Sequence, residues 1–473
     1  QIALLNNTTA SDNTAVGKQA LKQNTTGSSN TSVGSSALRE TTTASHNTAI
    51  GTSALALNTT GTQNTACGGN SLDANTTGNY NTGVGRGALG ANTTASNNTA
   101  VGQNSLGANT TGTENVAIGT NTADAGTISN TVAVGYNALT NTTNNHNTAV
   151  GSKALEDTTS GSSNVAVGSL ALTDNITGIS NVAVGMSALR YGTAGSNNAA
   201  FGGSALQNNT ASNNTAVGFQ SLKENTSGSG NVGVGQESLL ACTTGGGNTA
   251  VGRQSLKNST TGGNNTALGN AALFTATTGA NNTALGIFAL YYNTTGSLNT
   301  AIGRDALLNN TTGGGNVGVG FNAGNNITTG DNNVVVGQQS TASSATVDNE
   351  ITLGNSSHSS LRCNTQTISS LSDARDKTNV IDLPEGLDFV TKLRPVKFEW
   401  ATRDGNGKDG SFEHGFIAQD LQTAQKENDA DYLNMVLDEN PDRLEASYGK
   451  LVPILVKAIQ ELTMKVNKLK SNG

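Results

Sequence analysis

The residues best equipped for chemistry lie in one short stretch near the C-terminus. Residues 371–380 read Leu-Ser-Asp-Ala-Arg-Asp-Lys-Thr-Asn-Val, which places a serine and a lysine five residues apart. A serine hydroxyl is a weak nucleophile until a base removes its proton, and a lysine amine can be that base where burial lowers its pKa. From the residues alone, a serine in a serine-rich linker beside a solvated charge cluster is the simpler interpretation.

The sequence indicates no metal site and no cofactor site. Its three cysteines, Cys67, Cys242 and Cys363, are odd in number and widely spaced, so they form neither a disulfide framework nor a CxxC pair. Residues 404–410 read Asp-Gly-Asn-Gly-Lys-Asp-Gly. Lysine at a ligand position and aspartate at the glycine position argue against a calcium loop, so we expect a hairpin turn there.

Composition divides the 473 residues into two parts. Residues 1–371 contain no proline and no tryptophan, whereas residues 372–473 hold 32 of the 57 charged side chains. The net charge of −7 opposes nucleic-acid binding as the main role. No apolar run is long enough for a transmembrane helix, so we expect no membrane insertion.

A repeat governs the first part. Glycines equivalent to Gly17 recur at 21 positions as far as Gly354, and the intervals are 17 residues long with three exceptions of 16. The consensus is N-T-A-V-G-x-x-A-L-x-x-N-T-T-G-x-x, with asparagine four residues before the glycine in 19 of the 21 repeats. The period is too short for a helix pair or a propeller blade, and it favours one coil of a β-solenoid per repeat.

Alternation along each strand assigns its side chains to two faces. Thr14 and Val16 share one face, and we expect that face to be the core; Ala15 and Gly17 share the other, which would allow a neighbouring chain to approach closely. We expect the Ala-Leu pair to add a second apolar anchor, N-T-T-G to turn, and the stacked asparagines to form a hydrogen-bonded ladder.

The repeats resemble two families of fibrous proteins. Residues 1–354 look like the head repeats of trimeric autotransporter adhesins, which form parallel β-rolls in a homotrimer, and even more like the N-T-A-V-G arrays of phage and algal-virus fibres. The recurrent N-x-T triplets follow from the repeat, which makes glycosylation the weaker interpretation. The chain begins inside a coil, so we expect an N-terminal region to be missing or processed.

Residues 372–473 resemble the C-terminal intramolecular chaperone of phage tail spikes and fibres, including endosialidases. The resemblance is carried by S-D-x-R-x-K-x-N from residue 372 and by His-Gly-Phe-Ile-Ala-Gln-Asp at 414–420. It implies a small α+β domain that trimerises, templates the fibre and cuts the Leu371–Ser372 bond, with Ser372 and Lys377 as catalytic residues. Supporting roles would fall to Asp373, Asn379 and His414, although a hydrogen bond within a strand is the simpler role for the histidine.

The last helix carries a heptad pattern. Its a positions are Val452, Ile459 and Val466, and its d positions are Leu455, Leu462 and Leu469. Three such heptads require partner helices. The pattern alone favours a dimer, whereas the resemblance implies a trimer; we favour the trimer.

The sequence therefore predicts three parts: a β-solenoid shaft over residues 1–354, a linker over 355–371 and an auto-processing chaperone over 372–473. The leading hypothesis is a homotrimeric viral tail fibre that joins an upstream tail or baseplate protein and binds a host-surface glycan or protein receptor. The alternative is a bacterial cell-surface adhesin or extracellular filament. We expect self-cleavage and no activity on external substrates, because acidic residues are too sparse along the shaft for a glycan-cleaving face.

Overall fold

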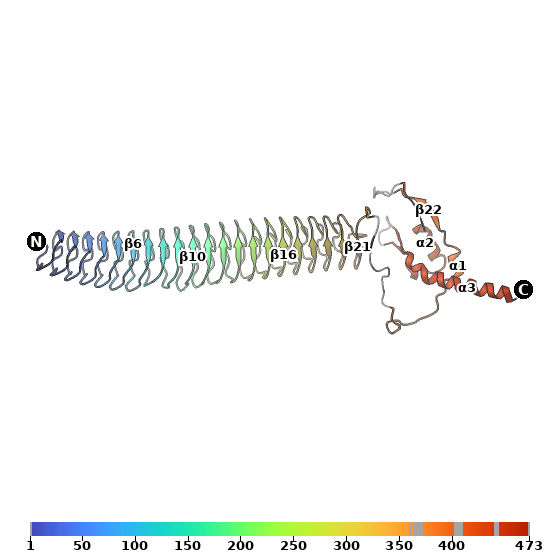
Figure 1. Ribbon diagram of the computed structural model, residues 1–473, viewed down its shortest axis with the longest axis horizontal. Coiled ribbons are helices and arrows are strands. Elements are labelled where there is room, and N and C mark those ends of the chain that lie inside the picture. The colour runs from blue at the N-terminus through green and yellow to red at the C-terminus, as the bar shows by residue number, and fades with distance from the viewer. Residues whose placement is uncertain (1, 359–360, 363–371, 402–409, 439–443, 472–473) are drawn as a thin grey trace.

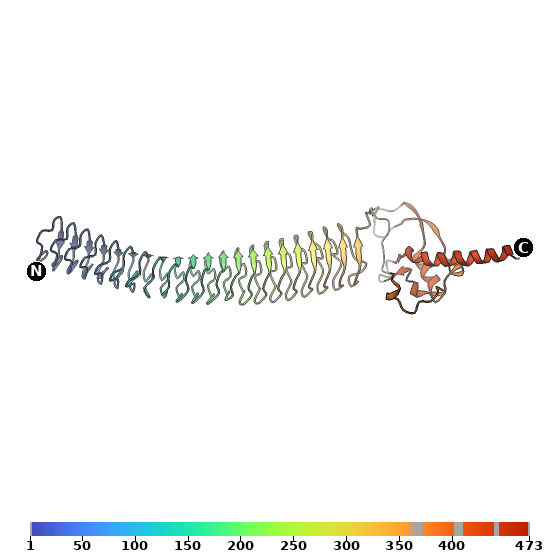
Figure 2. The same cartoon turned by 60° about the horizontal axis from the view of Figure 1, so that its bottom comes forward.

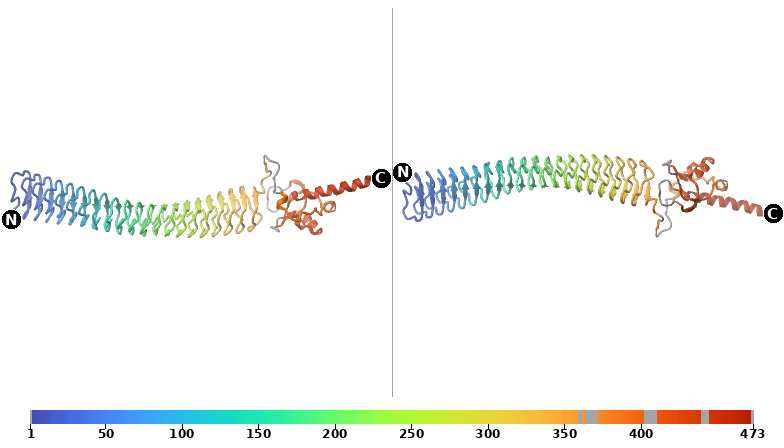
Figure 3. Two further views of the ribbon diagram at one scale, coloured as in Figure 1. Left: turned by 90° about the horizontal axis from the view of Figure 1, so that it is seen from below. Right: turned by 90° about the horizontal axis from the view of Figure 1, so that it is seen from above.

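The computed structural model describes residues 2–358, 361–362, 372–401, 410–438 and 444–471. Figure 1 shows a long rod that ends in a small mixed domain, from which a single helix projects along the rod direction. Figure 2 and Figure 3 show that the rod curves gently and keeps a constant coil shape along its length.

The rod is a parallel β-solenoid in which each repeat supplies one three-residue strand. Every strand pairs in parallel with the next along the chain, in a register that puts each residue beside its equivalent in the next repeat; Thr14 pairs with Thr31, for example. One coil per repeat is confirmed. The strands are β1 Thr14–Val16, β2 Thr31–Val33, β3 Thr48–Ile50, β4 Thr65–Cys67, β5 Thr82–Val84, β6 Thr99–Val101, β7 Val116–Ile118, β8 Val132–Val134, β9 Thr148–Val150, β10 Val165–Val167, β11 Val182–Val184, β12 Ala199–Phe201, β13 Thr215–Val217, β14 Val232–Val234, β15 Thr249–Val251, β16 Thr266–Leu268, β17 Thr283–Leu285, β18 Thr300–Ile302, β19 Val317–Val319, β20 Val334–Val336 and β21 Ile351–Leu353.

The prediction for the strand faces is wrong. The middle residue of the strand faces the core, and Ala49 and Ala250 are fully buried, whereas Val16 is 57% exposed. The reason is the narrow interior, which the leucine of each Ala-Leu pair already fills. At Gly318, the middle of β19, an added Cβ would lie 2.8 Å from Leu307 Cγ, and Val335 of β20 is the one branched aliphatic side chain among the middle residues of the strands.

The asparagine ladder is confirmed. Asn248 Oδ1 accepts a hydrogen bond from the backbone N–H of Asn265 at 2.9 Å, and Asn248 Nδ2 donates to the carbonyl oxygen of Gly262 at 2.9 Å. Both asparagines are fully buried. Each asparagine thus joins two coils and satisfies backbone groups that the narrow core hides from water.

The glycine after each strand permits close stacking of the coils. Gly17 has a φ of +133°, and a Cβ placed there would lie 2.4 Å from the carbonyl oxygen of Gly34 in the next coil. Only glycine meets both demands, which explains why this residue marks every repeat. The following turn is strained at its buried leucine, since Leu38 has a φ of +47°.

The C-terminal domain combines short helices with two antiparallel hairpins. Strands β22 and β23 form one hairpin, and β24 and β25 form the other. The elements are η1 Ala374–Asp376, α1 Leu387–Val390, β22 Val396–Glu399, β23 Phe412–Gly415, α2 Ala418–Lys426, η2 Asp431–Leu433, β24 Val436–Leu437, β25 Glu445–Ala446, η3 Tyr448–Lys450 and α3 Leu451–Ser471.

Helix α3 buries only one side of its first turns. Leu451, Ile454 and Ala458 are buried on that side, and Leu451 and Ile454 join the core of the domain with Phe389 and Leu421. All six heptad residues predicted from the sequence are exposed, from 40% at Val466 to 74% at Leu469. In the part of the chain that the structure describes, no helix is long and apolar enough to cross a membrane.

Candidate functional site

The structure brings the predicted serine and lysine together. Lys377 Nζ lies 2.6 Å from Ser372 Oγ and 3.3 Å from the Ser372 carbonyl oxygen. An unprotonated amine at that distance from a hydroxyl is placed to take its proton. The pair therefore has the geometry of a Ser-Lys nucleophile and base.

A single turn of 3-10 helix connects the two residues. Element η1 follows Asp373, whose Oδ1 atom accepts the N–H of Arg375 at 2.9 Å. The Arg375 side chain also donates to the Asp373 carboxylate, and these bonds hold the pKa of that carboxyl below its ordinary value. Asp373, predicted as a supporting residue, thus lies next to the pair and shapes its backbone.

Both members of the pair are exposed in the single chain, as are all residues from 372 to 382. Burial is what depresses the basicity of a lysine, because desolvation disfavours the charged ammonium. The single chain provides the hydrogen-bond geometry without the burial. The chemistry would therefore need a cover that the described residues of the single chain do not supply.

The remaining predicted site residues have different positions. Asn379 is exposed and left-handed, with a φ of +53°, in the extended segment that follows the lysine. His414 lies in β23, paired with Lys397, and no hydrogen bond among the described residues links it to Ser372 or Lys377. Leu371, on the other side of the predicted scissile bond, and residues 404–409 of the predicted hairpin turn lie outside the described residues.

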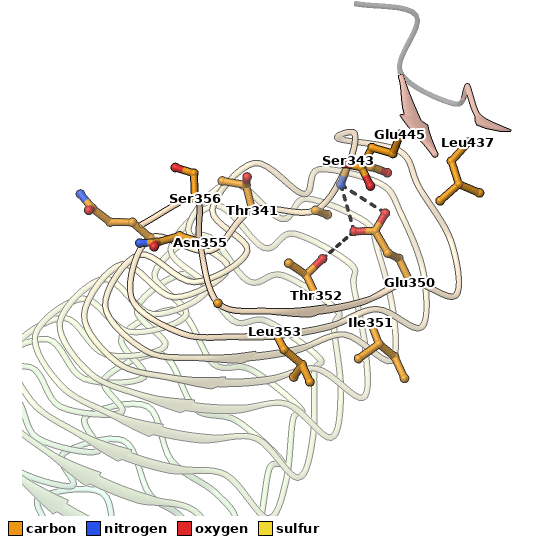
Figure 4. A pocket seen from close by; sticks show the side chains of 13 residues that line it. Thr341, Ser343, Glu350, Ile351, Thr352, Leu353, Asn355, Ser356, Leu437 and Glu445 are labelled. Carbon is orange, nitrogen blue, oxygen red and sulfur yellow. Dashed lines mark hydrogen bonds between the residues drawn. The ribbon is translucent and has the colours of Figure 1, made fainter. Parts of the chain in front are cut away.

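A polar cavity of about 480 Å³ lies between the last coil and the β24–β25 hairpin (Figure 4). Glu350 replaces the ladder asparagine here. Its carboxylate accepts the backbone N–H of Ser343 at 3.0 and 3.2 Å and the Thr352 hydroxyl at 2.7 Å. Glu350 N–H still donates to Asn333 Oδ1 at 2.9 Å, so this residue ends the ladder at the edge of the shaft.

The outward face of the strands is a feature that the sequence interpretation missed. The third residue of every strand is apolar and points away from the coil interior, and we name this column the strand ladder. The signal was present in the sequence, because polar residues never interrupt the column. Its members are Val16, Val33, Ile50, Cys67, Val84, Val101, Ile118, Val134, Val150, Val167, Val184, Phe201, Val217, Val234, Val251, Leu268, Leu285, Ile302, Val319, Val336 and Leu353.

Fold and site together define a class: a repetitive β-solenoid shaft followed by a separate domain that carries a Ser-Lys pair at its first residue. A family model described as the chaperone of endosialidase matches residues 372–429. That match begins at Ser372 and identifies a chaperone-type domain at the end of the chain. No curated protein and no solved structure gives a significant match.

Proposed function

We propose that this protein is the subunit of a homotrimeric viral tail fibre of the phage type, and that its C-terminal domain folds the fibre and then cuts itself off. The observation that carries the proposal is the 2.6 Å approach of Lys377 Nζ to Ser372 Oγ at the first residue of the chaperone match. The long coil array in front of that domain supports a shaft.

The cleavage proceeds through an ester. Unprotonated Lys377 takes the hydroxyl proton of Ser372 while Oγ attacks the carbonyl carbon of Leu371. The peptide C–N bond then breaks, Lys377 returns the proton to the leaving amine, and the Leu371 acyl group remains on Ser372 Oγ. Water hydrolyses this ester and gives a Leu371 carboxylate and a free serine hydroxyl.

The experiment follows the two products. Wild-type chains that have assembled should yield a shaft ending at Leu371 and a fragment starting at Ser372, identified by denaturing gels and N-terminal sequencing. Ser372→Ala and Lys377→Ala should assemble and remain uncut, and His414→Ala tests the supporting role predicted for that histidine. A wild-type chain that stays full length after assembly would make the domain a permanent cap.

Self-association is supported by two uncovered apolar surfaces on the same chain. The strand ladder extends over 20 coil steps of about 4.8 Å, roughly 96 Å, while monomeric proteins rarely expose apolar patches above a few hundred square ångströms. The heptad residues of α3 form the second surface. Copies of this chain that pack in parallel would cover both surfaces at once.

Charge placed on the strand ladder tests this assembly. The triple variant Val167→Glu, Val184→Glu and Val217→Glu should reduce the trimer to monomers or aggregates, measured by light scattering after chromatography. The matched control introduces three glutamates at exposed polar sites of neighbouring coils, namely Ser152, Ser169 and Ser180. Trimers that persist in the triple glutamate variant of the strand ladder would show that the interface lies elsewhere.

Attachment to a host is the role proposed for the assembled shaft. The fibre would join an upstream tail or baseplate protein and present the shaft to a surface glycan or protein receptor. Antibodies against residues 1–354 should decorate the tails of intact virions in electron micrographs. Decoration of bacterial surfaces with no virions present would instead support the adhesin alternative.

A further inference from the structure

The turn between the serine and the lysine determines whether they meet. Five residues of fully extended chain span about 17 Å, which a lysine side chain cannot bridge back to its starting point. Element η1 reverses the chain over this interval, and Lys377 N–H donates to the Ala374 carbonyl oxygen at 3.2 Å as the turn closes. The approach of Nζ to Oγ therefore depends on a turn of only three residues.

Among the described residues, this turn is held by local hydrogen bonds. No residue of η1 is buried, and short exposed helices are marginal in water because nucleation is unfavourable. Asp373 occupies the N-cap position with an extended backbone, accepts the Arg375 N–H, and its carbonyl oxygen accepts the Asp376 N–H at 3.2 Å. The side chain of Arg375 clamps the same carboxylate at 2.6 to 3.1 Å.

We infer that Asp373 is the positioning residue of the self-cleavage reaction: its N-cap bond forms the turn that delivers Lys377 to Ser372, with Arg375 as a secondary clamp. The inference rests on the proposed self-cleavage. The Asp373 N-cap bond should stabilise the turn more than the ion pair with Arg375 does, because loss of an N-cap residue typically costs more free energy than loss of an exposed ion pair.

The first measurement is the single-turnover cleavage rate of assembled chains. Asp373→Ala should cleave about two- to thirtyfold more slowly, the range expected for loss of an N-cap on a marginal turn. Asp373→Asn should restore most of the rate, since asparagine caps as well as aspartate. Arg375→Ala should lose about twofold. The matched control is Asp382→Ala, an exposed acid in the same segment, which should cleave at the wild-type rate.

A second measurement reports positioning without relying on cleavage. In Ser372→Cys, the nearby lysine cation should lower the pKa of the introduced thiol. Alkylation of this thiol by iodoacetamide should therefore extend to lower pH than it does in the double variant Ser372→Cys with Lys377→Ala. Mass spectrometry of the peptide containing position 372 follows the reaction in uncleaved chains. Adding Asp373→Ala should move the profile toward that of the lysine-free variant, and adding Asp373→Asn should not.

The two measurements separate the inference from the function on which it rests. An unchanged thiol profile in the Asp373→Ala background overturns the positioning role, whatever the cleavage result. An asparagine variant as slow as the alanine variant overturns the cap in favour of the charge. A wild-type chain that never cleaves, yet shows the expected thiol profiles, removes the proposed self-cleavage and leaves the positioning role standing.

Discussion

Removal of one ladder asparagine should open the shaft locally. In Asn248→Ala, the buried N–H of Asn265 loses its acceptor and the carbonyl oxygen of Gly262 loses its donor, two bonds of 2.9 Å each. Asn265 Nδ2 also loses a weaker bond of 3.2 Å to Asn248 Oδ1 but keeps its bond to the Gly279 carbonyl oxygen. A buried polar group left without a partner costs about 1–3 kcal/mol. The variant should therefore destabilise its two coils by about 2–6 kcal/mol.

Hydrogen exchange is the suitable assay, because coils of a solenoid open locally and a single melting temperature does not describe them. Peptides covering residues 245–270 should exchange at least about thirtyfold faster in the variant, as a change of about 2 kcal/mol requires. Thr261→Ala, at an exposed position on the same coil, is the control and should change little. Equal protection from hydrogen exchange in the two variants would refute the asparagine ladder as a source of stability.

Three further changes test other parts of the structure. Ala250→Leu should overpack the core and cost about 1–3 kcal/mol or more, seen by limited proteolysis, whereas Val251→Leu should be tolerated because the equivalent residue in the next coil is leucine. Burial raises the pKa of the Cys242 thiol to about 11 from an ordinary value of 9.0, so the unfolded thiol ionises first and stability should fall by about 2–3 kcal/mol as pH rises from 9 to 11, relative to Cys242→Ser in denaturant titrations. Glu350→Ala should speed amide exchange at Ser343 by about tenfold, since the variant lacks the carboxylate that accepts that N–H.

The sequence predicts the shaft well because each repeat states the same local rules. The stacked asparagines and the Ala-Leu pair have the roles that their types suggest, whereas the glycine after each strand meets the next coil of its own chain and not a neighbouring chain. Which strand face lies inside was not predictable from alternation. Alternation shows only that Thr14 and Val16 share a face, and the size of the interior, set by leucines across the coil, decides the direction.

The candidate site was accessible from the sequence only through the family resemblance. A spacing of five residues matches neither a helix face nor a strand face, so the approach of Lys377 to Ser372 depends on how the intervening turn is capped. The sequence shows an aspartate at position 373, but it does not show that this residue caps a turn. The burial that would activate the lysine is not supplied by the described residues of the single chain.

The asparagine ladder also makes the coils interchangeable. Each coil presents to its neighbour the same asparagine, glycine and strand that it receives, so a gene that gains or loses one repeat still encodes a continuous rod. Such an event changes the reach of the rod by about 4.8 Å and leaves its cross-section unaltered. Length is therefore a property that recombination between repeats can adjust in equal steps while the domain at the end remains the same.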